Sequence, residues 1–187
     1  MLNIVLIKFR KFTWLLKGML LRLYLNILGC KVGNNLKCKK WPLFRTIPKK
    51  NIFIGNNVNI GYRITLDISH SGKLILGNSV NLTQDIIISS AEMVTIGNDC
   101  LIAEHVSIRD GDHKFSKNLK INQQELSKKA IKIGTDVWIG AGSRVLKGAI
   151  IETGCIIAAN SIVLEKTKTE EFNIYAGSPI KHIGIRP

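Results

Sequence analysis

The stretch that decides the fold is residues 133–163, IGTDVWIGAGSRVLKGAIIETGCIIAANSIV. An aliphatic residue recurs in it at every sixth position, and a small residue or a valine stands four positions after most of these. The recurring residues are Ile133, Ile139, Val145, Ile151, Ile157 and Val163. A period of six, with glycine often next to the aliphatic residue, is typical of short strands that alternate with tight corners in a parallel β-helix.

The same rhythm extends back to Ile54 and supplies nine further aliphatic residues in three triplets. These are Ile54, Ile60, Leu66, Leu76, Leu82, Ile88, Ile96, Ile102 and Ile108. Three six-residue units make one triangular coil of about eighteen residues, and stacked coils bury their aliphatic residues in one column. The sequence therefore predicts an all-β solenoid of about five full coils within residues 30–166.

Interruptions of the rhythm fall only after the third strand of a coil. Four extra residues separate Leu66 from Leu76, two separate Ile88 from Ile96, and nineteen follow Ile108. Insertions that share one face of a repeat protein commonly build its binding surface, and long excursions are usually functional. We therefore expect a long loop, residues 109–131, to leave one corner of the solenoid and to carry part of a functional site.

Residues 1–29 have a different pattern, which predicts a basic amphipathic α-helix. Its apolar side is expected to hold Val5, Phe9, Phe12, Leu16, Met19, Leu20, Leu23 and Ile27. The opposite half holds Lys8, Arg10, Lys11, Lys17 and Arg22, and these cations interrupt any run long enough to span a bilayer. Two interpretations remain: the helix lies on an anionic membrane surface, or it packs on the domain or on a partner subunit.

The formal net charge of +14 is concentrated near the N-terminus, because residues 1–66 contain thirteen Lys or Arg and no acidic residue. Nucleic acid is not an expected partner, since no recognition motif is visible and a large apolar face does not serve phosphate contacts. The four cysteines form no CxxC pair, and we find no cleavable signal. We expect a reduced, cytoplasmic protein, peripheral at the inner face of the membrane if the helix binds lipid.

The repeat units, together with DVWIGAGSRVLKGAIIETGCIIAANSIV (136–163) and YAGSPIKHI (175–183), resemble the left-handed β-helix acyltransferases. The resemblance covers about residues 28–187. It is greatest to the O-acetyltransferases of capsule and exopolysaccharide synthesis, such as those of colanic acid, and to the galactoside and maltose acetyltransferases. It implies left-handed coils, a C-terminal tail (167–187) packed on them, a homotrimer, and acetyl-CoA as co-substrate between adjacent prisms, with no metal.

The resemblance also implies a general base. His113 matches the family's histidine at the base of the large loop, and Asp112 beside it is a candidate to orient the imidazole. A hydroxyl is a poor nucleophile, and an imidazole can remove its proton during attack on a thioester. The backbone N–H of Ala141 is the corresponding candidate donor to the oxyanion.

For the co-substrate, the resemblance assigns backbone contacts with the pantetheine arm to Ala141 and Ala159. It places Lys181 near the phosphates of CoA and Trp138 at the acyl pocket, although a tryptophan covering the edge of the prism is equally consistent with the sequence. Leu164-Glu165 and Asn160 depart from the family pattern at one turn of this site. Three polar residues are expected near the long loop and are candidates to bind the hydroxyls of an acceptor sugar. They are Asn81, Gln84 and Asp85.

The expected activity is acetyl-CoA-dependent O-acetylation of a saccharide hydroxyl in surface polysaccharide synthesis, the acceptor being free, nucleotide-linked or lipid-linked. N-acetylation of a nucleotide-linked amino sugar would also need a base and is the first alternative. A γ-type carbonic anhydrase would use three histidines, for which His70, His105 and His113 are the candidates. However, His105 follows a second strand and so leaves a different corner from the other two. A noncatalytic scaffold would leave the long loop without a purpose.

Overall fold

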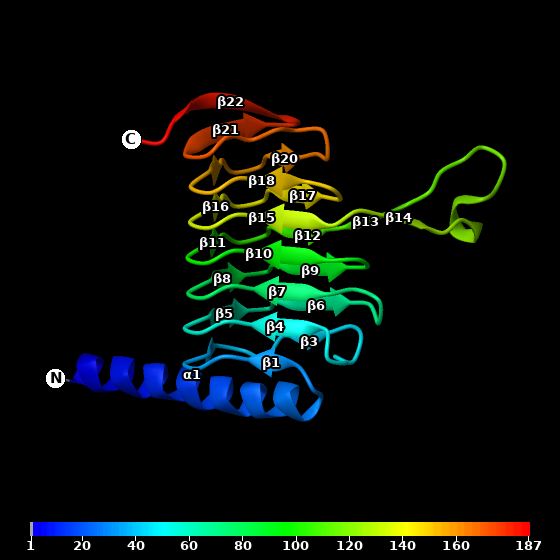
Figure 1. Ribbon diagram of the computed structural model, residues 1–187. Helices are drawn as coiled ribbons and strands as arrows, with labels where there is room; N and C mark the ends of the chain where they lie inside the picture. The colour runs from blue at the N-terminus through cyan, green and yellow to red at the C-terminus, as the bar shows by residue number, and fades with distance from the viewer. Residues whose placement is uncertain (1) are drawn as a thin grey trace.

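The computed structural model describes residues 2–187, and side chains from Leu6 onward. Short strands form three parallel sheets around one axis, here called sheets A, B and C (Figure 1). Sheet A contains β1 (Lys31–Val32), β4 (Ile52–Ile54), β7 (Leu74–Leu76), β10 (Val94–Ile96), β15 (Ile131–Ile133) and β18 (Ile150–Ile151). Sheet C contains β3 (Leu43–Phe44), β6 (Thr65–Ile68), β9 (Ile87–Ser90), β12 (Ser107–Arg109), β17 (Arg144–Leu146) and β20 (Ile162–Val163).

Sheet B is longer because the C-terminal segment adds to it. It contains β2 (Lys37–Cys38), β5 (Asn59–Tyr62), β8 (Asn81–Gln84), β11 (Leu101–Ile102), β16 (Trp138–Ile139), β19 (Ile156–Ile157), β21 (Asn173–Gly177) and β22 (Ile180–Ile185). Strand β21 pairs with β19 in parallel, and β22 returns antiparallel to β21. The tail thus covers the C-terminal end of the solenoid.

The core is the column of aliphatic residues that defines the six-residue period. All fifteen point inward, and none exposes more than 4% of its surface. Each contributes on the order of 1.5–3 kcal/mol of hydrophobic stabilisation before entropy is counted. The prediction of a β-solenoid with one N-terminal helix is confirmed.

The solenoid has six complete coils, and β21 begins a seventh, which is more than the expected five. The additional first coil keeps the register, since Val32 pairs with Ile54, Cys38 with Ile60 and Phe44 with Leu66. Its inward residues are a valine, a cysteine and a phenylalanine. Because two of these three residues are not aliphatic, the six-residue aliphatic pattern becomes visible only in the second coil, at Ile54.

The three insertions predicted from the sequence lie where sheet C leads into sheet A of the next coil, at what we call the C–A corner (Figure 1). The first coil adds a fourth at the same corner, since Phe44 and Ile54 are separated by ten positions instead of six. The longest begins and ends with β13 (Gly111–His113) and β14 (Leu126–Lys128), which pair antiparallel, and a 3-10 turn, Ile121–Gln123, lies farther out. We call residues 110–130 the hairpin. It projects away from the stack of coils (Figure 1).

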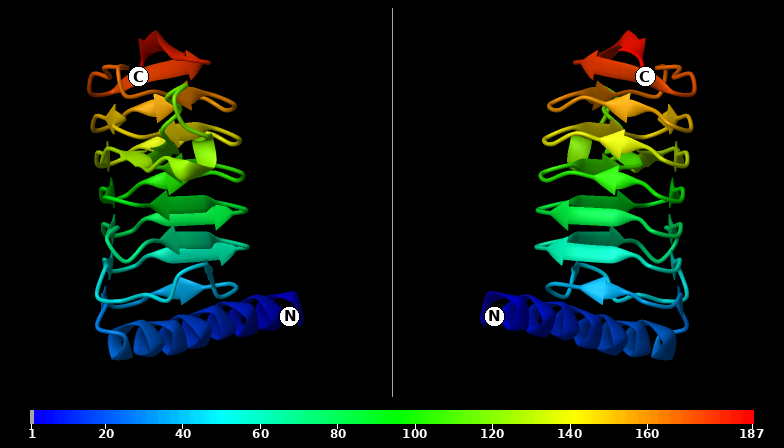
Figure 2. Two further views of the ribbon diagram at one scale, coloured as in Figure 1. Left: turned by 90° about the vertical axis from the view of Figure 1, so that its right-hand side faces the viewer. Right: turned by 90° about the vertical axis from the view of Figure 1, so that its left-hand side faces the viewer.

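Helix α1 (Leu2–Ile27) lies across the N-terminal end of the solenoid (Figure 2). It packs on the first coil through Gly18, Leu21 and Leu25, which are all buried. The apolar side predicted from the sequence faces the other way, with Phe12 62% and Ile27 75% exposed. The sequence pattern also places Val5 on that side, and its side chain lies outside the described residues.

The helix therefore packs on its own domain through a different face from the expected one. None of the helices in residues 2–187 is long and apolar enough to cross a membrane.

Gly18 sets how closely α1 approaches the first coil. A Cβ atom there would lie 1.8 Å from the carbonyl oxygen of Leu36, which is backbone and cannot move aside alone. We expect Gly18→Ala to displace the helix and to lower the free energy of unfolding by about 1–2 kcal/mol, as overpacking does. Met19→Ala, at the exposed neighbour, should change it little. Thermal unfolding of both variants measures the difference, and equal melting temperatures would contradict the close packing.

The four cysteines are buried side chains with free thiols. Burial raises the pKa of the Cys38 thiol to about 11, against a smaller opposing effect of Lys17, and burial likewise raises the pKa of Cys100 to about 11. The thiolate is the reactive form of cysteine. These residues therefore act as small apolar side chains of the core.

Candidate functional site

Chemistry-bearing groups gather at two corners of the solenoid. One is the C–A corner with the hairpin. The other lies where sheet B leads into sheet C, and we call it the B–C corner. There successive coils are joined by backbone hydrogen bonds, from His105 N–H to Gln84 O (3.2 Å), Gly142 N–H to Glu104 O (2.9 Å) and Asn160 N–H to Ala141 O (2.7 Å). These bonds align the corner residues of coils three to six in one column.

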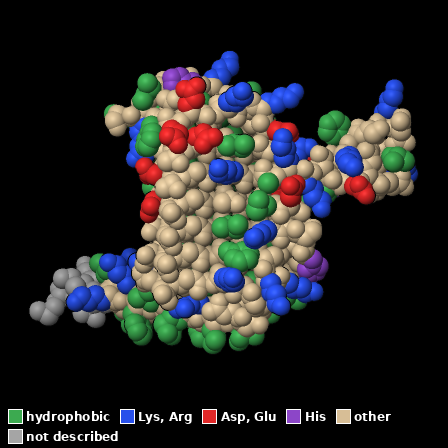
Figure 3. Space-filling view, viewed as in Figure 1, with side chains coloured by type: hydrophobic (Ala, Val, Ile, Leu, Met, Phe, Trp, Pro, Cys, Tyr) green, Lys and Arg blue, Asp and Glu red, His purple; other side chains and the backbone are tan. Residues whose placement is uncertain are grey.

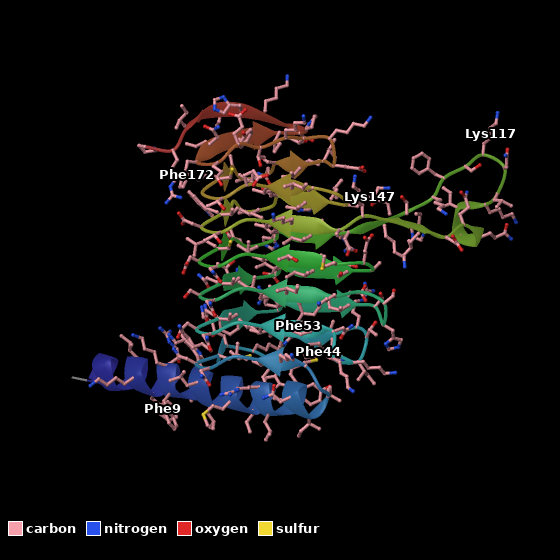
Figure 4. The ribbon with its side chains drawn as sticks, viewed as in Figure 1. Phe9, Phe44, Phe53, Lys117, Lys147 and Phe172 are labelled. Atoms are coloured by element: carbon pink, nitrogen blue, oxygen red, sulfur yellow. The ribbon has the colours of Figure 1, made fainter. Side chains whose placement is uncertain are left out.

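His113 stands at the end of β13, at the base of the hairpin, and is exposed. No hydrogen bond joins it to Asp112 in the part of the chain that the structure describes. The Asp112 carboxylate instead lies 3.7 Å from the Lys147 ammonium, which also donates to Ser127 Oγ (2.8 Å). Figure 4 shows Lys147 where the hairpin leaves the coils. The structure therefore places Asp112 against Lys147 and leaves the imidazole free.

Asp110, which the sequence reasoning missed, anchors the hairpin. It is fully buried, and its carboxylate accepts hydrogen bonds from the backbone N–H groups of Ala91 (2.6 Å) and Glu92 (3.0 Å) and from the Ser90 hydroxyl (2.8 Å). Its carbonyl oxygen accepts from the N–H of Lys129, on the returning strand (2.9 Å). A single side chain thus ties the insertion of coil three to the base of the hairpin, three residues before His113.

Ala141 and Ala159 lie at the B–C corner, one above the other. Neither backbone N–H has a hydrogen-bond acceptor within the described residues. The coils also approach closely here, since a Cβ on Gly140 would lie 2.5 Å from the nitrogen of Ala159. Small side chains and two free N–H groups in line form a surface on which an extended chain with carbonyl groups can lie.

The C-terminal tail reaches the same column. The N–H of Gly177, the last residue of β21, donates to Ser161 Oγ (3.1 Å) at the B–C corner. Lys181, four residues later, is exposed on β22 and lies opposite Ala176 of β21. The structure thus brings Ala141, Ala159 and the strand carrying Lys181 together along one edge. Trp138 is 49% exposed on the outer face of sheet B, between Leu101 and Ile156.

The three candidate acceptor residues do not lie beside their own hairpin. Asn81 begins β8 and accepts a hydrogen bond from Asn59 Nδ2 (2.6 Å) on the outer face of sheet B. Gln84 and Asp85 lie at the B–C corner, across sheet C from the hairpin. The expectation that these residues lie near the hairpin of the same chain is therefore wrong. The strands of sheet B end at the B–C corner, whereas the strands of sheet C end at the C–A corner, where the hairpin begins. A hydrogen bond from Arg63 (Nη2 to Oδ2, 2.6 Å) lowers the pKa of Asp85 and keeps it charged.

A shallow cavity of about 340 Å³ lies beside Asp85 on the outer face of sheet C. Polar side chains on its wall include His105, Ser107, Arg109 and Arg144. Arg144 Nη1 donates to the carbonyl oxygens of His105 (3.0 Å) and Gly142 (2.6 Å), which stiffens the corner. Sequence reasoning did not single out the two arginines. Each arginine stands next to an inward-facing aliphatic residue, Ile108 or Val145, so the strand alternation predicts that its side chain points outward.

The metal alternative has no geometric support among the described residues. No group of three His, Cys, Asp or Glu side chains could hold an ion. His105 lies at the B–C corner, whereas His70 and His113 leave the C–A corner. The three histidines of that alternative are therefore divided between two corners.

Stacked six-residue repeats with a long insertion at one corner are the architecture of a hexapeptide-repeat protein, and the comparisons with known proteins identify its class. The family model described as "Bacterial transferase hexapeptide (six repeats)" matches residues 130–165. WbbJ of Escherichia coli K12, named for O-acetyl transfer in lipopolysaccharide biosynthesis, is 34% identical over 141 residues, which cover 71% of each protein. The dTDP-4-amino-4,6-dideoxy-D-glucose acyltransferase of Escherichia coli is 30% identical over 161 residues, covering 83% of this chain and 81% of that protein.

Among solved structures, a mutant of AntD, an N-acyltransferase from Bacillus cereus in complex with dTDP and coenzyme A, superposes with a TM-score of 0.73. It is 22% identical, and the match covers 87% of this chain and 88% of the AntD chain. A galactoside acetyltransferase in complex with coenzyme A has a TM-score of 0.58 at 22% identity, covering 83% of this chain and 64% of the other. The chain belongs to the hexapeptide-repeat acyltransferase family, which confirms the predicted enzyme class and a left-handed β-helix.

Proposed function

We propose that this enzyme transfers an acetyl group from acetyl-CoA to a saccharide hydroxyl in surface polysaccharide synthesis, with His113 as general base. The observation that carries the proposal is the alignment of two free backbone N–H groups, at Ala141 and Ala159, along the B–C corner. The strand that carries Lys181 lies at the end of the same edge. This alignment suits the pantetheine arm of acetyl-CoA, which would supply the acyl group as a thioester. The neighbours AntD and galactoside acetyltransferase hold coenzyme A in their structures.

Within one chain, His113 and the proposed acetyl-CoA site at Ala141 and Ala159 lie on opposite edges of sheet C. From Val106 to Asp110 the chain crosses about 13 Å of extended strand, and the hairpin then points away from the coils (Figure 1). His113 therefore cannot serve the B–C corner of its own chain. We propose a homotrimer in which the hairpin of one subunit reaches the B–C corner of the next.

Within such a site the hydroxyl oxygen of the acceptor attacks the thioester carbonyl carbon while His113 removes the hydroxyl proton. The negative charge that develops on the carbonyl oxygen is stabilised by the N–H of Ala141. When the carbon–sulfur bond breaks, the proton on His113 passes to the leaving thiolate. The products are an ester of the sugar and free CoA, and no acyl-enzyme is needed.

The acceptor class has two candidates. The relationship to WbbJ favours a hydroxyl of a surface polysaccharide. The relationship to the dTDP-amino-sugar acyltransferase favours an amine on a nucleotide-linked sugar, and Arg109 and Arg144 beside the B–C corner cavity suit a phosphate. Hydroxylamine distinguishes the products, because it cleaves an ester and leaves an amide intact.

Calorimetric titration of acetyl-CoA into the full chain tests the donor site. We expect saturable binding near one molecule per chain, and a Kd raised about ten-fold by Lys181→Ala because a charge-assisted contact with phosphate is lost. Lys132→Ala removes an exposed lysine of sheet A and should leave Kd unchanged. Absence of binding at millimolar acetyl-CoA would overturn the proposal. Sedimentation equilibrium at three times the chain mass of 20.8 kDa would support the trimer.

A further inference from the structure

The face of α1 that points away from the solenoid is apolar and has no partner within the described residues. Its seven large side chains are each between 46% and 75% exposed. They are Phe9, Phe12, Leu16, Met19, Leu20, Leu23 and Ile27. Figure 3 shows apolar side chains along the end of the molecule formed by α1, and Figure 4 shows Phe9 directed away from the coils. Contiguous apolar surfaces of this kind usually mark a site of protein or membrane interaction.

The charge around this face indicates which partner it meets. No acidic residue precedes Asp67, and of the thirteen Lys and Arg before it only Arg45 and Arg63 form salt bridges among the described residues. Arg10 and Lys39 stack on the ring of Trp14, 5.2 and 4.9 Å from its centroid, and so stay close to the helix. An apolar face surrounded by cations without acidic partners is complementary to a lipid bilayer, which has an apolar interior beneath anionic headgroups.

We propose that α1 docks the enzyme on an anionic phospholipid membrane, with its exposed apolar face inserted at the level of the headgroups. A second copy of the chain does not fit as well, because pairing two such ends would bring together two sets of unpaired cations. Nucleic acid would leave the apolar residues in water. Each cation near an anionic surface strengthens binding about five-fold, and each apolar side chain that leaves water adds to this.

Docking would also orient the enzyme. Because α1 lies flat across the end of the coils (Figure 2), the solenoid axis would stand upright on the membrane. Coil four, which carries the hairpin, lies three strand spacings, or about 14 Å, above the first coil. The transfer site would then face the space above the lipid headgroups rather than the bilayer itself.

Flotation of the full chain with vesicles tests the proposal. We expect the protein to float with vesicles of phosphatidylcholine and phosphatidylglycerol (3:1) at least ten-fold more than with phosphatidylcholine alone, and less at high salt. The double substitution Phe12→Glu/Leu23→Glu should lower the bound fraction at least ten-fold, and Lys8→Glu/Lys11→Glu should lower it by a similar factor. The control Ile183→Glu/Ile185→Glu makes the same chemical change at exposed residues of the opposite end and should bind like the wild type.

Circular dichroism of each variant shows whether α1 is retained, so that a loss of binding is not a loss of folding. Equal flotation with both vesicle types, or no flotation with either, would overturn the proposal. It would also be overturned if the lipid-free wild type formed assemblies twice the mass of the Phe12→Glu/Leu23→Glu variant, since a second copy would then cover the face.

Discussion

Replacing His113 with alanine is expected to lower kcat for acetyl transfer about 10²–10⁴-fold, the usual contribution of a positioned general base. The Kd for acetyl-CoA should change little, because His113 is proposed to act on the acceptor hydroxyl, whereas CoA is held by the backbone N–H groups of Ala141 and Ala159 and by Lys181. Folding should not change either, since the imidazole is exposed and donates to no described residue. The measurement is release of CoA thiol in the presence of the saccharide that the wild type accepts, combined with the acetyl-CoA titration.

Two controls separate catalysis from structure. His70→Ala removes an exposed histidine from the same corner two coils earlier and should keep full activity. Added imidazole should restore part of the activity of His113→Ala, because a free base can occupy the space of the missing side chain, and no structural role would respond to it. Activity of His113→Ala within three-fold of the wild type would show that another group removes the proton.

Most of the fold could be predicted from the sequence because each coil repeats the same physical requirement. An inward position must be apolar to fill a narrow prism, so the period is visible wherever an aliphatic residue meets it. The first coil was missed because Cys38 and Phe44 meet the requirement without being aliphatic. The helix was expected from its amphipathic pattern, but Gly18, which determines the packing face, has no apolar side chain to mark it.

The site was less predictable because it depends on which corner each strand end reaches. The six-residue repeat led to the expectation that Gln84 and Asp85 lie near the hairpin, whereas in the structure they lie on the other side of sheet C. The cavity with Arg109 and Arg144 faces outward, where a sequence pattern cannot distinguish a binding residue from a hydrated one. Asp110 could not be recognised for a related reason: an acidic residue beside a loop suggests exposure to solvent, and only the folded structure shows its buried hydrogen bonds.

Asp110→Ala is expected to lower the free energy of unfolding by about 3 kcal/mol. The N–H groups of Ala91 and Glu92 would lose their acceptor, and the Ser90 hydroxyl would keep only the carbonyl oxygen of Lys73, 3.0 Å away. Each buried donor left without an acceptor costs about 1–3 kcal/mol. For a chain of this length the melting temperature should fall by about 6–12 °C.

Two matched variants make the result specific to this carboxylate. Asp112→Ala removes a partly exposed carboxylate two residues away and should cost less than about 1 kcal/mol, because exposed ion pairs contribute little. Asp110→Asn keeps the shape and one acceptor oxygen, so its melting temperature should lie between those of the wild type and Asp110→Ala. Because neighbouring coils of a solenoid can unfold separately, hydrogen exchange at residues 89–92 and 110–130 should rise before exchange elsewhere. A melting temperature of Asp110→Ala within 1 °C of the wild type would mean that water replaces the carboxylate and that the hairpin is anchored by its strand pairing alone.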